Sequence, residues 1–309
     1  MSSGRERKTG LARATWYPLP GFDCELDSFE LPHDSGGVTI SVIKPEELRH
    51  LFSDYPVKGP ADDQCLPKGR YFKLVYEGTG LSPEALLALG DLVVAALRLF
   101  KNGYVDAPVC SFSYEGGYGG GHSTPSRAAT AWDQGISYCL AAEEVPAFAS
   151  HWDAIRALYF STLDWRGGCV LSAPMRRFML SYDERPPEDI YLDRWMALEM
   201  LLDPGAKTPR DFFRRVRLSL LISGEPLERK RIYLDLAELA DVRGGIVHRG
   251  QRMHFIDEAL ERLTEYVRRA LVGYAAFAAS TGRSELHGIN NMLDDQILLG
   301  ILDLPLNVK

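Results

Sequence analysis

The chain of 309 residues lacks the cysteine and histidine patterns that mark disulfide-rich and metal-binding proteins. Its five cysteines are widely spaced and include no C-x2-C pair, which excludes a zinc ribbon and a disulfide scaffold. Cysteine usage of this kind is typical of a reducing compartment. The seven histidines show no metal-ligand spacing, so we expect neither a metal nor another cofactor.

Long apolar segments are missing as well. The polar and basic N-terminus has no apolar core of a secretory signal. The most apolar stretch, residues 86–100, is interrupted by Gly90, Asp91 and Arg98 and is too short to span a bilayer. The sequence therefore predicts a cytoplasmic protein without a membrane partner.

An excess of basic residues, which is usual in proteins that bind nucleic acid, is also absent. The net charge is −7, from 35 Lys and Arg against 42 Asp and Glu. The charge is uneven, because residues 170–280 hold 18 basic and 17 acidic residues while the remainder holds 17 basic and 25 acidic. The C-terminal part is thus close to neutral, which restricts any contact with nucleic acid to local clusters of arginine.

Motifs of several common enzyme classes are absent too. The chain has no G-x-S-x-G elbow, no H-E-x-x-H pair and no kinase-type H-R-D. The glycines of residues 115–123 do not form a phosphate-binding loop, because no Gly-Lys-Ser or Gly-Lys-Thr follows them. We interpret this segment as a surface loop.

Residues 15–145 have the mixed pattern of an α+β domain. One helix is marked by Ser82 as its N-cap and Pro83 in its first turn, and its apolar run ends at Phe100. Residues 1–14 are polar and basic and are predicted to form a disordered tail. Strands are predicted, from alternation and from β-branched and aromatic residues, at residues 24–31, 38–43, 71–76, 109–114 and 136–142.

From residue 146 onward the pattern is helical. A connecting helix or linker is expected at residues 146–169, followed by a helical bundle at 170–282 and a C-terminal extension at 283–309. Within the bundle, helices are predicted at residues 174–182, 190–202, 208–223, 226–242 and 255–279. The fold class is therefore an α+β N-terminal domain followed by an all-α helical bundle.

The segment Arg243-Gly244-Gly245-Ile246-Val247-His248 is the strongest candidate for chemistry. Histidine moves protons near neutral pH because its unperturbed pKa is about 6.5. Arginine carries a permanent charge and a planar fork of donors that suits a phosphate oxygen. On an unbroken helix two residues five apart point about 140° apart. Paired glycines permit a kink or a helix end, so we expect Gly244 and Gly245 to relieve this separation.

The surrounding sequence resembles the HEPN superfamily, in particular its Apea-like branch. The resemblance rests on the segment Asp193-Arg194-Trp195-Met196-Ala197-Leu198-Glu199-Met200-Leu201-Leu202, a spacer helix, a helix ending in R-x4-H and a closing helix. It covers about residues 170–282. It implies a helical bundle that forms a homodimer and, in many members, a metal-independent endoribonuclease that serves as a toxin or in anti-phage defence.

The expected reaction cuts RNA to 2′,3′-cyclic phosphate and 5′-hydroxyl ends without a metal. His248 would move the protons, and Arg243 would stabilise the charged phosphorane. One histidine cannot easily act as base and acid in the same step. A two-fold dimer that brings two motifs together would supply two histidines and two arginines, so RNA cleavage is expected at a dimer interface.

Further site residues follow from the resemblance and from local positive charge. Glu199 occupies the family's acidic position and is expected to face the cleft and orient Arg243, with an ordinary rim glutamate as the alternative. Arg249, Arg252 and Arg194 are candidates for RNA binding. The N-terminal domain is expected to bind a trigger or regulator.

Other features favour a second interpretation. Gly244 follows the arginine directly, whereas catalytic relatives often have a polar residue there, and the bundle is neutral. His248 alone is also compatible with capping a helix C-terminus, where a cation is favoured. The alternative function is therefore a non-catalytic HEPN module that dimerises or binds RNA or a protein.

Overall fold

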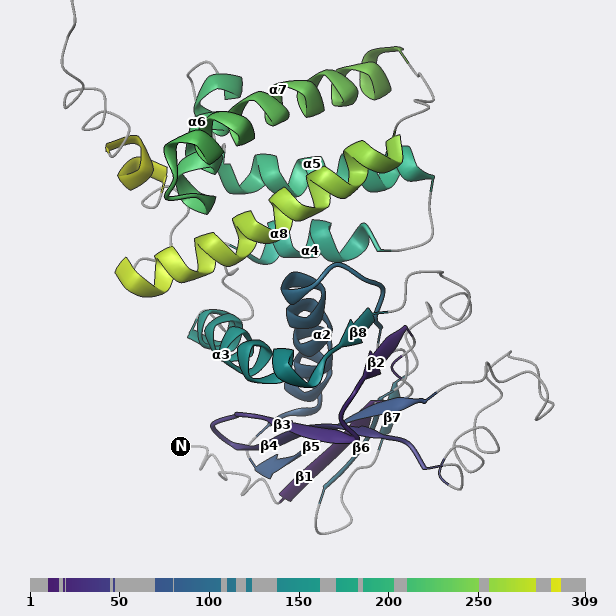
Figure 1. Ribbon diagram of the computed structural model, residues 1–309. Helices are drawn as coiled ribbons and strands as arrows, with labels where there is room; N and C mark the ends of the chain where they lie inside the picture. Colours follow the sequence, from purple (N-terminus) through teal and green to yellow (C-terminus); the bar gives the residue numbers. More distant parts are fainter. Residues whose placement is uncertain are drawn as a thin grey trace, which may run out of the picture. The chain divides into compact units, whose positions relative to one another are not determined.

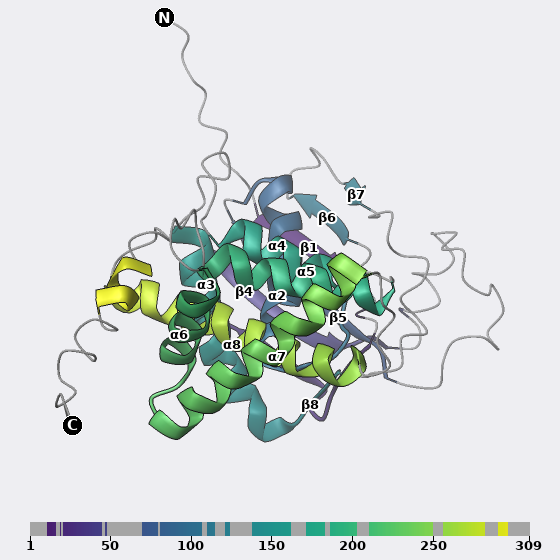
Figure 2. The same ribbon diagram turned by 90° about the horizontal axis from the view of Figure 1, so that it is seen from above.

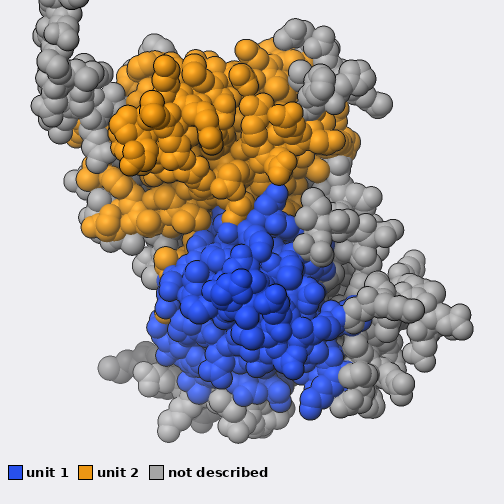
Figure 3. Space-filling view, viewed as in Figure 1, with its two compact units in different colours: residues 1–153 blue, residues 154–309 orange. Residues whose placement is uncertain are grey.

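The computed structural model describes residues 11–16, 19, 21–44, 47, 70–79, 81–106, 110–114, 121–123, 138–161, 171–182, 186–202, 210–249, 256–281 and 290–295. The chain divides into two compact units, Met1–Asp153 and Ala154–Lys309 (Figure 3). Unit 1 contains an antiparallel sheet, and the described part of unit 2 is helical (Figure 1). The predicted order of an α+β part followed by a helical part is confirmed at this level. The division falls inside the segment 146–169 that was expected to connect the two domains.

The sheet of unit 1 has six strands, and every neighbouring pair in it is antiparallel. In spatial order the strands are β3 (Ser28–Leu31), β4 (Gly36–Val42), β5 (Phe72–Thr79), β1 (Leu11–Trp16), β6 (Cys110–Tyr114) and β7 (Gly121–Ser123). A separate parallel pair joins β2 (Phe22–Cys24) to β8 (Tyr138–Leu140). The last three residues of the glycine-rich segment are thus an edge strand rather than a loop, and residues 115–120 lie outside the described residues.

Strand β1 corrects the prediction that residues 1–14 form a disordered tail. Leu11–Trp16 lies in the sheet between β5 and β6 and pairs with both. Ala12, Ala14 and Trp16 are buried at 0%, 0% and 2% exposure, so alternate residues of the strand face the core. Alanine is a poor strand former, and pairing on both edges stabilises this strand where local propensity does not. Residues 1–10 lie outside the described residues.

Helix α2 (Pro83–Phe100) packs against β1 at a glycine. Ser82 caps it as predicted, because its Oγ accepts the backbone N–H of Ala85 at 3.2 Å. A Cβ atom added at Gly90 would lie 2.2 Å from Nε1 of the buried Trp16. Only glycine therefore permits this close approach of the helix to the strand.

A short 3-10 turn, η2 (Ala142–Glu144), leads into helix α3 (Val145–Ser161), which begins in unit 1. Phe148 is fully buried in this part of α3, against the rings of Phe29 and Phe100. Trp152 is also fully buried, and its Nε1 donates to the carbonyl of Pro32 at 2.7 Å. These aromatic contacts fix the first turns of α3 on unit 1.

Unit 2 is built around two long helices that pack along each other, α5 (Pro187–Leu202) and α8 (Ile256–Thr281) (Figures 1 and 2). Leu198 and Leu201 of α5 and Leu263 and Val267 of α8 are all buried at 0% exposure. Its helices are α4 (Ser172–Leu180), α5 (Pro187–Leu202), α6 (Arg210–Ile222), α7 (Pro226–Arg249) and α8 (Ile256–Thr281). None of the helices in the described ranges combines the length and the apolarity needed to cross a lipid bilayer.

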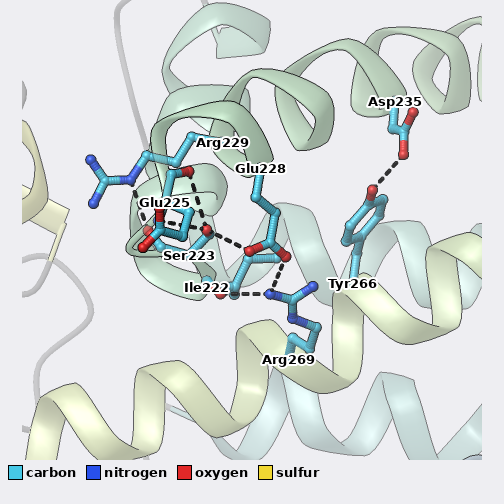
Figure 4. A network of polar contacts seen from close by, with 8 residues as sticks. All are labelled: Ile222, Ser223, Glu225, Glu228, Arg229, Asp235, Tyr266 and Arg269. Carbon is cyan, nitrogen blue, oxygen red and sulfur yellow. Dashed lines mark hydrogen bonds and ion pairs between the residues drawn. The ribbon is translucent and has the colours of Figure 1, made fainter.

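Helices α6 and α7 form a hairpin whose corner is tied to α8 through Glu228 (Figure 4). Ser223 Oγ donates to Glu228 Oε2 at 2.7 Å, and Arg269 Nη2 donates to Glu228 Oε1 at 2.9 Å. The same Arg269 nitrogen donates to the carbonyl of Ile222 at 2.7 Å. The hydrogen bonds from Ser223 and Arg269 hold the pKa of the Glu228 carboxyl below its usual value.

A helical turn at residues 290–295 packs on the end of α5 and on the middle of α6. Arg217 of α6 binds Asp294 through two parallel contacts, Nε to Oδ1 at 2.8 Å and Nη2 to Oδ2 at 2.6 Å. Asn290 Nδ2 donates to the carbonyl of Leu201 at 3.0 Å. Part of the extension 283–309 is therefore anchored to unit 2.

Candidate functional site

Helix α7 continues without a break through the paired glycines and ends at Arg249. The helix predicted at residues 226–242 thus extends through the R-x4-H motif, and the paired Gly244 and Gly245 do not end it. Glycine inside a helix costs about 0.5–1 kcal/mol relative to alanine. The buried face of α7, formed by Ile232, Leu236 and Leu239, offsets that cost by packing along the bundle.

Arg243 continues the packed face of α7. The spacing from Leu236 and Leu239 to Arg243, seven and four residues, places the three side chains on one side of the helix. Arg243 is half-buried there, whereas Leu239 is fully buried. Toward its C-terminal end the packed face of α7 is thus partly open to solvent, and Val247 beside it is 47% exposed.

His248 is exposed and lies on a different side of α7. Five residues of continuous helix separate it from Arg243, so the two side chains point about 140° apart around the axis. The structure therefore does not bring Arg243 and His248 of one chain onto a common face. Neither side chain forms a hydrogen bond or an ion pair with the described residues.

The carboxylate of Glu199 binds residues other than Arg243. Its Oε1 accepts from Nε1 of Trp195 at 2.8 Å and pairs with Nη2 of Arg214 at 3.2 Å. The Arg214 guanidinium also lies over the Trp195 ring, 5.5 Å from its centroid. Glu199 thus joins α5 to α6 in the chain, and the arginine that it orients is Arg214.

The sequence did not single out Arg214 as a partner of Glu199. The i, i+4 spacing of Trp195 and Glu199 is a signal for their hydrogen bond on one helix face. The partner across the helices is set by tertiary packing, and no spacing along the chain indicates it.

Arg194 has partners in the bundle core instead of an exposed position for RNA. It is 8% exposed, its Nε donates to Ser181 Oγ at 3.1 Å, and its Nη1 donates to Thr264 Oγ1. Its guanidinium lies 5.2 Å from the ring centroid of Tyr182. These contacts connect α5 with α8 and with the end of α4, and they hold the Arg194 guanidinium in the interior of unit 2, away from a surface that could contact RNA. The side chain of Arg249 and all of Arg252 lie outside the described residues.

His248 is the only histidine among the described residues of unit 2. It is therefore the only described imidazole there that could transfer a proton. The hydroxyl of Tyr191 donates to the Leu239 carbonyl at 2.7 Å. The hydroxyl of Tyr266 donates to Asp235 Oδ2 at 2.6 Å (Figure 4). Burial raises the pKa of both tyrosines, which makes them poor proton donors to a substrate near neutral pH. In the described ranges, no three side chains of His, Cys, Asp or Glu gather as ligands for a metal ion.

Comparison of the chain with models of protein families, with curated proteins and with solved structures gives no match.

Proposed function

We propose that the protein is a metal-independent endoribonuclease of the HEPN type that acts as a homodimer. The observation that carries the proposal is the end of α7, where an exposed His248 and a half-buried Arg243 have no partner among the described residues. The order of helices in residues 170–282 and their resemblance to HEPN domains add support. A cytoplasmic role as a toxin or anti-phage effector, with unit 1 binding a trigger, rests on the resemblance.

The proposed reaction takes place between two chains. Because Arg243 and His248 of one chain point about 140° apart, each chain offers its histidine and its arginine on different sides of α7. A two-fold pair of chains provides a second histidine and a second arginine. One His248 removes the proton of the ribose 2′-hydroxyl, and the resulting oxygen attacks the adjacent phosphorus.

The other half of the reaction concerns the leaving 5′-oxygen and the negative charge of the phosphorane. The partner's His248 donates a proton to the leaving 5′-oxygen as the P–O5′ bond breaks, while Arg243 stabilises the negative phosphorane. The products are a 2′,3′-cyclic phosphate and a 5′-hydroxyl. No metal takes part, so EDTA does not slow the reaction.

A second candidate is a non-catalytic HEPN module that dimerises or binds RNA or a protein. The unbroken α7 favours it, since the helix keeps Arg243 and His248 apart. The pairing of Glu199 with Arg214 favours it as well, because this carboxylate is then not used to orient Arg243.

Cleavage of total RNA and tRNA in EDTA separates the two candidates. Wild type is compared with His248→Ala and Arg243→Ala, and with Arg176→Ala as an arginine control, since Arg176 is exposed on α4. The nuclease proposal expects cyclic-phosphate ends with wild type and with the control, and loss of cleavage in the other two variants. Cleavage that survives both substitutions contradicts the assignment, and RNA binding without cleavage by wild type supports the second candidate.

A further inference from the structure

The side of α7 that faces away from the bundle carries exposed leucines. Leu227 is 85% exposed and Leu234 is 52% exposed. They are seven residues apart and therefore lie on one face of the helix. Figure 1 shows α7 as an outer helix of unit 2, with α5 and α8 on its inner side. A single exposed leucine is ordinary on a protein surface, so the charges around the two leucines decide whether the face has a partner.

Those charges are separated by sign on the two sides of Leu234. Lys230 and Arg231 are exposed before it, and Glu238 and Asp241 are exposed after it. At 100° per residue all four lie within about 60° of Leu234 around the axis, so they share its face. Neither basic residue lies three or four positions from Glu238 or Asp241, so these charges form no pair of the kind that stabilises a single helix. The stability of α7 itself therefore does not account for this arrangement.

The pattern is complementary to itself under a two-fold rotation. An antiparallel second α7, related by an axis close to Leu234, places residues before this leucine against residues after it in the other copy. Arg231 then faces the partner's Glu238, and Lys230 reaches the partner's Asp241. Leu234 meets its own counterpart at the axis. One operation thus covers the leucine and forms four contacts between opposite charges.

We propose that this face of α7 binds a second copy of the chain with the two helices antiparallel. The α7 face is defined by Leu227, Lys230, Arg231, Leu234, Glu238 and Asp241. Arg231 and Lys230 form no ion pair with the described residues, so both are available to a partner. Glu238 accepts from Arg262 Nη1 at 3.0 Å through Oε2, and its side chain is 66% exposed, which leaves Oε1 for the second chain.

This pairing is separate from the one that RNA cleavage requires. Arg243 lies nine residues beyond Leu234, so the two copies of Arg243 would be roughly 27 Å apart along the helix axes. The α7 face therefore does not build a shared Arg243 and His248 site. The α7 face is a second two-fold surface of the chain, and its pairing does not depend on nuclease activity.

Charge reversal tests the pairing. We would measure the association of full-length protein by sedimentation velocity over a range of concentrations at low salt. Arg231→Glu or Lys230→Glu places like charges opposite each other twice, and we expect the dissociation constant to rise on the order of tenfold or more. The reciprocal double variants, Arg231→Glu with Glu238→Arg and Lys230→Glu with Asp241→Lys, should restore association. The second pair serves as a check because Asp241 has no ion pair with the described residues, whereas Glu238 binds Arg262.

Cysteine cross-linking tests the register. In a background with serine at Cys65, Cys139 and Cys169, Leu234→Cys lies at the axis and should form a disulfide-linked dimer under mild oxidation. Leu227→Cys is the control, since its two copies would be roughly 21 Å apart although Leu227 is the more exposed residue. Random collision favours Leu227→Cys, and the proposed pairing favours Leu234→Cys.

Either experiment can overturn the proposal. A wild-type chain that stays monomeric, single reversals without effect, or double reversals that fail to restore association would each exclude the α7 pairing. Cross-linking of Leu227→Cys that equals or exceeds that of Leu234→Cys would exclude the register. Thermal melting of each variant establishes that the helices remain folded.

Discussion

Glu199 of α5 pairs with Arg214 of α6 at 3.2 Å and accepts a hydrogen bond from Trp195 through the same oxygen. The arginine side chain is 7% exposed and the glutamate side chain 29%. This cluster therefore joins two helices from a largely buried position. In this structure Glu199 pairs with Arg214 rather than with Arg243, the arginine that the family resemblance implies.

Glu199→Gln should keep most RNA cleavage if the proposed nuclease is active. Glutamine retains an oxygen that can accept from Trp195, and Arg243 does not depend on this carboxylate in the structure. Single-turnover rates of Glu199→Gln and Arg243→Ala provide the comparison. Equal losses in the two variants would mean that Glu199 does orient Arg243 during catalysis.

The same cluster predicts a stability difference. Arg214→Met should lower the free energy of unfolding by about 1–3 kcal/mol, because Glu199 then loses its charged partner in a half-buried site. Urea denaturation monitored by circular dichroism measures the change. Arg176→Met is the matched control on an exposed part of α4 and should change the stability by less than about 0.5 kcal/mol.

Gly244→Ala should stabilise the protein. A Cβ atom at Gly244 meets nothing within 4 Å, and α7 is helical at this position. Alanine lowers the conformational entropy of the unfolded chain, so a gain of about 0.5–1 kcal/mol is expected. Gly90→Ala is the opposite case, since its Cβ would lie 2.2 Å from Trp16 Nε1, and a loss of about 1–3 kcal/mol is expected from overpacking. A lower melting temperature for Gly244→Ala would show that α7 is not a stable helix there.

The corner between α6 and α7 should weaken in acid. Hydrogen bonds from Ser223 and Arg269 lower the pKa of Glu228 in the folded state. A lowered folded pKa stabilises the protein above the unfolded value, about 4.3, and this contribution is lost as the pH falls through the folded pKa. Glu228→Gln should therefore melt at a lower temperature than wild type at pH 7, and the difference should shrink toward pH 3.

Glu225→Gln is the control for this pH dependence. Glu225 is exposed in the same corner, and its carboxylate forms no hydrogen bond with the described residues (Figure 4). Melting curves of Glu225→Gln should follow wild type from pH 7 to pH 3. A constant difference between Glu228→Gln and wild type across this range would show that the Glu228 carboxylate is not the titrating group.

His248→Ala and Arg243→Ala are expected to act on the rate of RNA cleavage. If the nuclease proposal holds, His248→Ala should lower kcat on the order of 10²–10⁴-fold through lost proton transfer, and Arg243→Ala on the order of 10²–10³-fold through lost charge stabilisation. Melting temperatures should stay close to that of wild type for His248→Ala, because His248 is exposed. A large fall in the stability of His248→Ala would indicate a structural role for this histidine.

Capping residues and prolines in the sequence indicated where helices begin. Ser82 and Pro83 marked the start of α2, and the cap is formed as predicted. Helix α5, predicted at residues 190–202, begins three residues earlier, at Pro187. Capping and proline geometry act within a few residues of the chain, so they can be recognised without knowledge of the fold.

The missed features depend on contacts between distant segments. Strand β1 has small alternating residues and is stable because it pairs with both β5 and β6. The paired glycines predicted an end or kink of α7, and packing of its buried face kept the helix intact.

The sequence by itself determined the helical character of the C-terminal part, the α+β character of the N-terminal part, and the candidate pair Arg243 and His248. Periodicity and residue chemistry are local properties, and they suffice for these conclusions. Only the tertiary structure decided that Glu199 binds Arg214, that Arg194 lies in the core, and that the leucines and charges of α7 share an exposed face. These facts depend on which helix faces pack together, and packing is set by the whole core rather than by any single segment.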